Sequence, residues 1–163
     1  PQMGACVNEP VRRGRSVGTD GLMELADEVP VELYGMGVNQ LSARGIRSHE
    51  SPPQHDMHRL LVRCAGYVHT ARWTSLGLSL LEAMHLGLPV VAVGATEVPR
   101  AIPPGAGVVV SSSAELRIAC RRLLDAPDEA RELGSRGRDH AREKYGLGRF
   151  LTDWDRLLSQ LAN

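Results

Sequence analysis

One continuous stretch, residues 73–94, limits the fold of this chain more than any other feature does. It reads WTSLGLSLLEAMHLGLPVVAVG. A small polar turn leads into a predicted helix over residues 78–86, and Gly87 and Pro89 end that helix. Residues 90–94 follow as an apolar run, which is typical of a strand buried on both faces of a parallel sheet.

The predicted helix carries an apolar stripe made by Leu78, Leu81 and Leu88, and Glu82 lies apart from it. Because the preceding turn is rich in small residues, free backbone N–H groups and the positive end of the helix dipole point at the space in front of the helix. The backbone of residues 75–79 therefore predicts an anion-binding site.

Predicted strands and helices alternate along the whole chain. Short apolar runs predict strands over residues 3–7, 31–34, 45–49, 66–70, 90–94 and 107–110. Helical patterns begin at Thr19 or Asp20 and cover residues 56–64, 78–86, 96–101, 114–124, 129–144 and 149–161. This alternation predicts an α/β fold, a Rossmann-like open parallel sheet with helices on both faces. No linker or repeat interrupts it, so residues 1–163 are expected to form a single domain.

Composition excludes several classes of partner. Lys+Arg and Asp+Glu number 19 each, so nucleic acid is not expected as a partner. No run approaches the roughly 18 apolar residues of a transmembrane segment, no signal peptide is recognised, and a cytoplasmic location is expected. The chain opens at Pro1 without an initiator Met, as a fragment of a longer protein would.

Neither a lysine-based site nor a metal site is predicted. Lys144 is the only lysine and lies in a polar helix, so any phosphate must be held by arginine or by backbone N–H groups. The cysteines are widely spaced in apolar contexts and are expected to be reduced and buried: Cys6, Cys64 and Cys120. Residues 54–58 hold two histidines and an aspartate, but no distant third ligand is evident, and a solvated helix start is favoured over a metal site.

Several loops that follow predicted strands could supply a ligand site. Arg12, Arg13 and Arg15 lie in the first of them, and together with the helix start at residues 75–79 they suit a diphosphate. Glu82 could reach a hydroxylated group such as a ribose beside the phosphates, or it could be a partly exposed helix residue.

Four aromatic residues have alternative roles. His69 ends a predicted strand, where it either contacts ligand or is an ordinary strand-end histidine. Trp73 is expected to pack and seat its loop rather than stack on a sugar. Phe150 and Trp154 are expected to lie in the core or to anchor the last helix on another domain.

Residues 75–92 resemble the nucleotide-sugar site of retaining glycosyltransferases with the two-domain GT-B fold. Members of that family read E-G-F-G-L-x-L-L-E-A-M-A-x-G-x-P-V-V-A, beginning at the position of Thr74, and from Ser75 onward this chain reads S-L-G-L-S-L-L-E-A-M-H-L-G-L-P-V-V-A. The order of predicted elements agrees over nearly the whole chain, which resembles the C-terminal, donor-binding half of a group 1 enzyme. The variant at residues 73–77 resembles an actinobacterial branch.

The resemblance implies a role for each matching residue. It implies that Glu82 binds the donor ribose, and that residues 49–54 recognise the base. The donor-binding positions it implies are Gly14, Gly35, Gly37, Thr74, Ser75, Leu76, Gly77, Leu78, Ser79 and Glu82, and the catalytic positions are Arg12 and Arg13. It further implies sugar transfer with retained anomeric configuration, without a metal or other cofactor, to an acceptor held by an N-terminal domain. This chain alone is therefore not expected to turn over.

One residue departs from the family pattern. Thr74 stands where the family has the first Glu of its E-x7-E motif, and a hydroxyl carries no charge. A catalytically inactive nucleotide-binding or interaction module is therefore an alternative. A dinucleotide-binding Rossmann domain is a further one, although residues 8–15 lack its G-x-G-x-x-G pattern.

Overall fold

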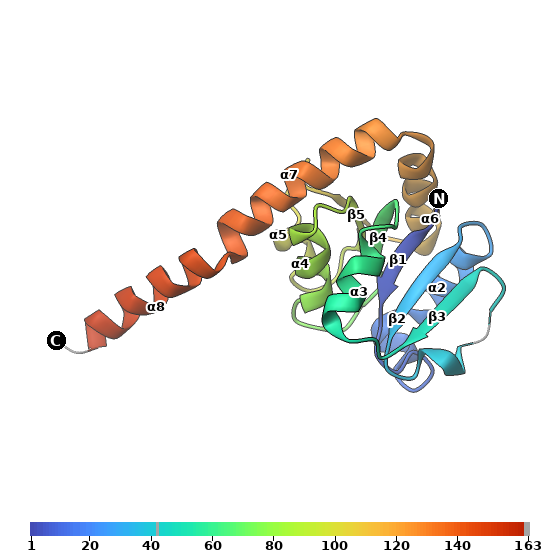
Figure 1. The fold of residues 1–163 in the computed structure, drawn as a ribbon, viewed down its shortest axis with the longest axis horizontal. Coiled ribbons are helices and arrows are strands. Elements are labelled where there is room, and N and C mark those ends of the chain that lie inside the picture. The colour runs from blue at the N-terminus through green and yellow to red at the C-terminus, as the bar shows by residue number, and fades with distance from the viewer. Residues whose placement is uncertain (42, 162–163) are drawn as a thin grey trace.

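A computed structural model describes residues 1–41 and 43–161 of the chain. Six strands form one sheet in the order β3-β2-β1-β4-β5-β6, and every neighbouring pair is parallel (Figure 1). The strands are β1 (Met3–Cys6), β2 (Val31–Gly35), β3 (Ile46–Glu50), β4 (Gly66–His69), β5 (Val90–Val93) and β6 (Val108–Val110). The predicted open parallel sheet is confirmed.

Helices follow most strands, as the alternating pattern predicts. They are α1 (Gly14–Val17), α2 (Thr19–Ala26), the 3-10 turn η1 (Val38–Gln40), α3 (Gln54–Leu61), α4 (Leu78–His85), α5 (Val98–Ala101), α6 (Ser113–Asp125), α7 (Pro127–Tyr145) and α8 (Leu147–Leu161). The short pieces α1 and η1 were not predicted, whereas the equally short α5 was, within residues 96–101.

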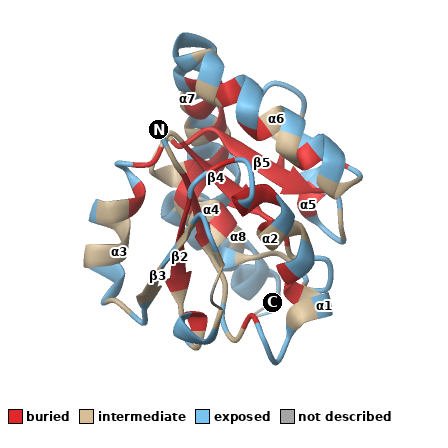
Figure 2. Cartoon of the chain, turned by 90° about the vertical axis from the view of Figure 1, so that its right-hand side faces the viewer, coloured by how far each residue is buried: buried red, intermediate tan, exposed pale blue. Residues whose placement is uncertain are grey.

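The sheet is buried on both faces, and Figure 2 shows the buried residues gathered on the strands and the inward sides of the helices. Val91 and Val93 of β5 belong to a core cluster that includes residues of α2 and α6. Val90 and Ala92 of the same strand belong to a second cluster, which includes residues of α3 and α4. The apolar run of residues 90–94 therefore does form a strand covered on both sides.

The buried face of α4 differs from the predicted stripe. Leu80, Ala83 and Met84 are fully buried, whereas Leu78 is 75% exposed and Leu81 only partly buried. The prediction for Leu78 is wrong because the first turn of α4 borders a cavity instead of the core.

Helix α7 packs closely against the α4–β5 turn. A Cβ atom added to Gly134 would lie 2.2 Å from the carbonyl oxygen of Gly87, so only a residue without a side chain fits there. The outer face of α7 carries ion pairs, including one between Glu132 and Arg136, four residues apart.

Helix α8 extends away from the rest of the chain (Figure 1). It contains no buried residue, and Phe150 and Trp154 are 55% and 48% exposed. The expectation that these two rings lie in the core is wrong, because they line an open hollow shared with residues of α4, α5 and α7. Their contact with another domain stays a prediction.

No helix within the described residues is both long and apolar enough to cross a membrane. All three cysteines are free; Cys64 and Cys120 are buried, and Cys6 is partly exposed.

We expect Gly134→Ala to lower the free energy of unfolding by about 1–3 kcal/mol, because its methyl group would collide with backbone atoms that cannot rotate away. Denaturant unfolding followed by circular dichroism measures this loss. The control is Gly148→Ala in α8, where an added Cβ meets nothing within 4 Å. Since alanine favours helix, that variant should be as stable as the wild type or slightly more so, and an equal loss in both variants would contradict the packing argument.

Candidate functional site

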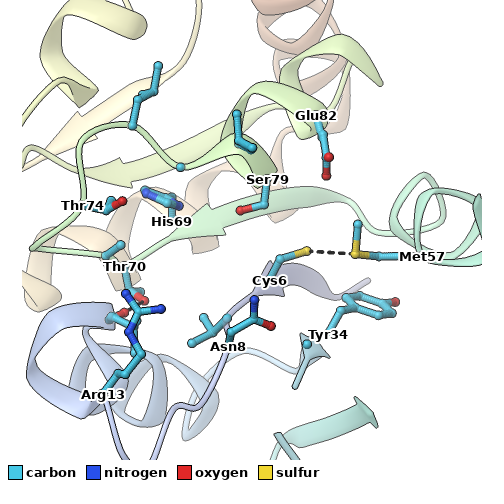
Figure 3. A pocket seen from close by; sticks show the side chains of 17 residues that line it. Cys6, Asn8, Arg13, Tyr34, Met57, His69, Thr70, Thr74, Ser79 and Glu82 are labelled. Carbon is cyan, nitrogen blue, oxygen red and sulfur yellow. Dashed lines mark hydrogen bonds between the residues drawn. The ribbon is translucent and has the colours of Figure 1, made fainter. Parts of the chain in front are cut away.

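A cavity of about 440 Å³ opens at the carboxyl ends of the central strands, between the loops that follow β1 and β4 (Figure 3). Its lining residues are Cys6, Val7, Asn8, Arg13, Val17, Tyr34, Gly35, Met57, His69, Thr70, Ala71, Thr74, Leu76, Gly77, Leu78, Ser79 and Glu82. The sheet reverses its winding between β1 and β4, and ligands of open α/β sheets bind at such a point.

The cavity collects most, but not all, of the residues predicted from sequence. Arg13, Gly35, Thr74, Glu82 and residues 76–79 line it. The others do not: Arg12, Gly14, Arg15, Gly37 and Ser75.

Two of the outlying residues have other partners. Arg12 forms an ion pair with Glu9 and lines a separate, smaller hollow with Gly37. The Ser75 carbonyl accepts a hydrogen bond from the Thr96 hydroxyl at 3.0 Å. Arg12 and Arg13 are adjacent in sequence, yet only Arg13 reaches the cavity.

The first turn of α4 borders the cavity. No side chain among the described residues caps the backbone N–H groups at this end of the helix. Gly77 precedes the helix in an extended conformation (φ −71°, ψ 120°), and it forms no side-chain cap hydrogen bond. The first turn carries no acidic residue, so no carboxylate of α4 competes for these donors. An uncapped helix start holds about half a positive charge, which suits an anion.

Arg13 supplies a full positive charge to the same cavity. It precedes α1 and is exposed, and no carboxylate among the described residues lies within ion-pair distance of it. Thr70 fixes the two loops relative to each other, because its hydroxyl donates to the carbonyl of Val17 at 2.7 Å. The loops after β1 and β4 therefore face each other across a fixed gap.

His69 lies at the end of β4, beneath the loop that begins α4. Its side chain is 5% exposed, and its Nε2 atom has no hydrogen-bond partner among the described residues. Burial lowers the pKa of His69 to about 4, so the ring is neutral at pH 7. A Cβ atom on Gly77 would lie 2.5 Å from the ring carbon Cε1, so the ring occupies the space that a side chain at position 77 would need.

Helix α3 contacts Glu82 from across the cavity rim. Gln54 donates its side-chain N–H to Glu82 Oε1 at 2.8 Å, and His58 Nε2 lies 3.5 Å from Glu82 Oε2. The Glu82 side chain is 27% exposed and lines the cavity, and its contact with a ribose stays a prediction. No signal in the sequence links residues that lie this far apart.

Two sulfur atoms form the floor of the cavity, and sequence reasoning did not find them there. Cys6 Sγ lies 3.6 Å from Met57 Sδ. Burial raises the pKa of Cys6 to about 12, which keeps the thiol neutral and therefore a poor nucleophile.

The position of Trp73 decides a further prediction. Trp73 is 79% exposed, so the expectation that it packs to seat its loop is wrong. Among the described residues, no group of three or more His, Cys, Asp or Glu side chains gathers closely enough to hold a metal ion, and residues 54–58 are no exception.

The sequence of this chain matches the model of one protein family. The model of the family described as "Glycosyl transferases group 1" matches residues 43–140. A trehalose synthase from Rubrobacter xylanophilus is 38% identical over 85 residues, which are 52% of this chain and 20% of that protein.

Solved structures share the fold. Sucrose-phosphate synthase from Thermosynechococcus elongatus superposes with a TM-score of 0.78 at 20% identity, over 98% of this chain and 45% of that one. HepE from Anabaena, solved in complex with UDP-glucose, superposes with a TM-score of 0.77 at 18% identity, over 97% of this chain and 48% of that one. The chain thus spans less than half the length of these matches.

We expect His69 to make the fold less stable as pH falls from 6.5 to 4. In this window the unfolded chain protonates His69 and the folded chain does not, so acidification favours unfolding, by about 3 kcal/mol at pH 4. Unfolding of the wild type and of His69→Gln at pH 7 and pH 4.5 measures the difference.

His69→Gln should lose less stability on acidification than the wild type does. The control is His55→Gln, which replaces an imidazole that is 69% exposed instead of buried. An ordinary pKa for His69 by NMR, near 6.5, would contradict the prediction.

Proposed function

The chain belongs to the group 1 glycosyl transferases, and we propose that its cavity binds the nucleoside diphosphate of a nucleotide-sugar donor. One observation carries the proposal: Arg13, from the loop after β1, and two parts of α4, its uncapped start and Glu82, converge on one cavity. A cationic end and a carboxylate end, held together, complement a ligand that has both phosphates and hydroxyl groups.

The diphosphate is assigned to the end of the cavity between Arg13 and α4. Backbone N–H groups at the start of α4, including those of Leu78 and Ser79, donate to phosphate oxygens along the helix dipole. Arg13 adds charge-assisted hydrogen bonds from the loop after β1.

The ribose is assigned to Glu82. An ionised carboxylate has two acceptor oxygens, which suit a pair of vicinal hydroxyl groups. Residues 49–54, between β3 and α3, are proposed to recognise the base.

As part of a longer protein, the chain is proposed to take part in sugar transfer with retained configuration to an acceptor bound elsewhere in that protein. When the glycosidic bond breaks, negative charge develops on the departing diphosphate. Arg13 and the start of α4 would stabilise that charge, which is electrostatic catalysis without a need for a metal ion.

An inactive nucleotide-binding module is the second candidate, and Thr74 is the observation that favours it. Thr74 lines the cavity and brings a neutral hydroxyl to a position where the family has a carboxylate. Both candidates bind the nucleotide. Hydrolysis of the donor by the full-length protein would support the enzyme, and binding without hydrolysis would support the module.

We expect the chain to bind at least one of UDP, GDP and ADP in calorimetric titration. UDP is the first probe, because HepE was solved with UDP-glucose. NAD is the control ligand: binding of NAD but of none of the three diphosphates would reject the proposal in favour of a dinucleotide-binding domain.

We expect Arg13→Ala to weaken nucleoside diphosphate binding by about 1.5–3 kcal/mol, since it removes hydrogen bonds to a charged group. Arg12→Ala is the matched control, because Arg12 is the adjacent arginine and pairs with Glu9 outside the cavity. Titration of both variants with the same nucleotide measures the difference. A larger loss in Arg12→Ala would show that the phosphates bind in the hollow at Gly37 instead.

A further inference from the structure

We propose that Gln54 is a positioning residue: it holds the Glu82 carboxylate in the orientation that distinguishes a ribose from a 2′-deoxyribose. The proposal rests on the proposed function, because it assumes that Glu82 faces the sugar of a bound nucleotide. It adds a second residue, from a different helix, on which that selectivity depends.

The contact joins two helices that the chain places on the same face of the sheet. Gln54 is the first residue of α3, and Glu82 lies in the middle of α4. The Gln54 amide nitrogen donates to Glu82 Oε1 at 2.8 Å, which is a well-formed hydrogen bond. Within the described residues, the Glu82 carboxylate accepts no other hydrogen bond.

A glutamate needs such a partner to present its carboxylate in one orientation. The terminal torsion of glutamate is broad and roughly two-fold, so the rotamer alone does not fix the plane of the two oxygens. Donation from Gln54 to Oε1 restricts that torsion, because rotation of the carboxylate would lengthen or bend the hydrogen bond.

The contact still leaves Glu82 free to bind. An ionised carboxylate offers about four lone-pair sites, and Gln54 uses one of them. His58 Nε2 lies 3.5 Å from Oε2 and has no hydrogen-bond partner among the described residues. Both oxygens therefore keep acceptor capacity for hydroxyl groups, and a neutral amide leaves the negative charge of Glu82 in place.

These properties make the amide of Gln54 specific for its task. A cationic side chain at position 54 would compete with the ligand for the Glu82 carboxylate. An acidic side chain there would repel the Glu82 carboxylate. Loss of the amide should weaken ribose binding most, because two hydroxyl groups depend on the orientation of the carboxylate and a 2′-deoxyribose offers only one of the two.

The test is calorimetric titration of the chain with UDP, GDP and ADP and with their 2′-deoxy forms. We expect the wild type to prefer the ribose form at least about tenfold. Gln54→Ala should reduce that preference about three- to tenfold, because the affinity for the ribose form should fall more than the affinity for the 2′-deoxy form. Gln54→Glu, which places a like charge beside Glu82, should reduce it at least as much.

A double-mutant cycle separates positioning from a structural effect. Glu82→Ala should abolish the ribose preference, and Gln54→Ala should have no further effect in that background. The matched control is Gln160→Ala, an exposed glutamine on α8, which should retain the wild-type preference. Because Gln54 is exposed, its variants should keep the wild-type melting temperature.

The possible failures are distinct. If the wild type binds none of the three diphosphates, the proposed function fails and the role of Gln54 fails with it. If the wild type binds a diphosphate but Gln54→Ala leaves the ribose preference unchanged, or lowers both affinities equally, only the role of Gln54 is overturned. An equal effect of Gln54→Ala with and without Glu82 would also overturn it.

Discussion

The pairing of β1 with β4 at the centre of the sheet is the constraint on which the site depends. It is a short contact, in which Met3 aligns with Gly66 and Gly4 with Tyr67. Because the chain winds outward from this pair in both directions, the loops after β1 and β4 leave toward opposite faces and open a crevice between them. Arg13 reaches that crevice from one loop and the start of α4 from the other.

Much of the fold could be predicted because apolar runs and helical periods are local signals. Strand order could not, since periodicity does not record which strands are neighbours. The error at Leu78 has a related cause: its spacing fits an apolar stripe, but a functional cavity replaces the core at the first turn of α4. The burial of Phe150 and Trp154 was predicted wrongly for a similar reason. An amphipathic pattern shows that a helix has an apolar face, but it does not show whether another part of the same chain covers that face.

The candidate site was predictable where one segment carries several of its residues, as residues 74–82 do. It was not predictable where contacts join distant segments. Nothing in the sequence separates Arg12 from Arg13, yet the turn before α1 directs one to Glu9 and the other to the cavity. The contact between Gln54 and Glu82 could not be predicted for the same reason, because the two residues lie on different helices.

The close contact between His69 and Gly77 restricts the order in which these two positions can change. A side chain at position 77 has no room while an imidazole lies beneath it. Replacement of His69 by a smaller residue frees that space, so exchange at position 69 must come first, and exchange at position 77 can follow. If Gly77 were substituted while His69 is still present, the loop at the start of α4 would be distorted. The two positions therefore behave as a single unit in any redesign of this cavity, with glycine the last to be altered.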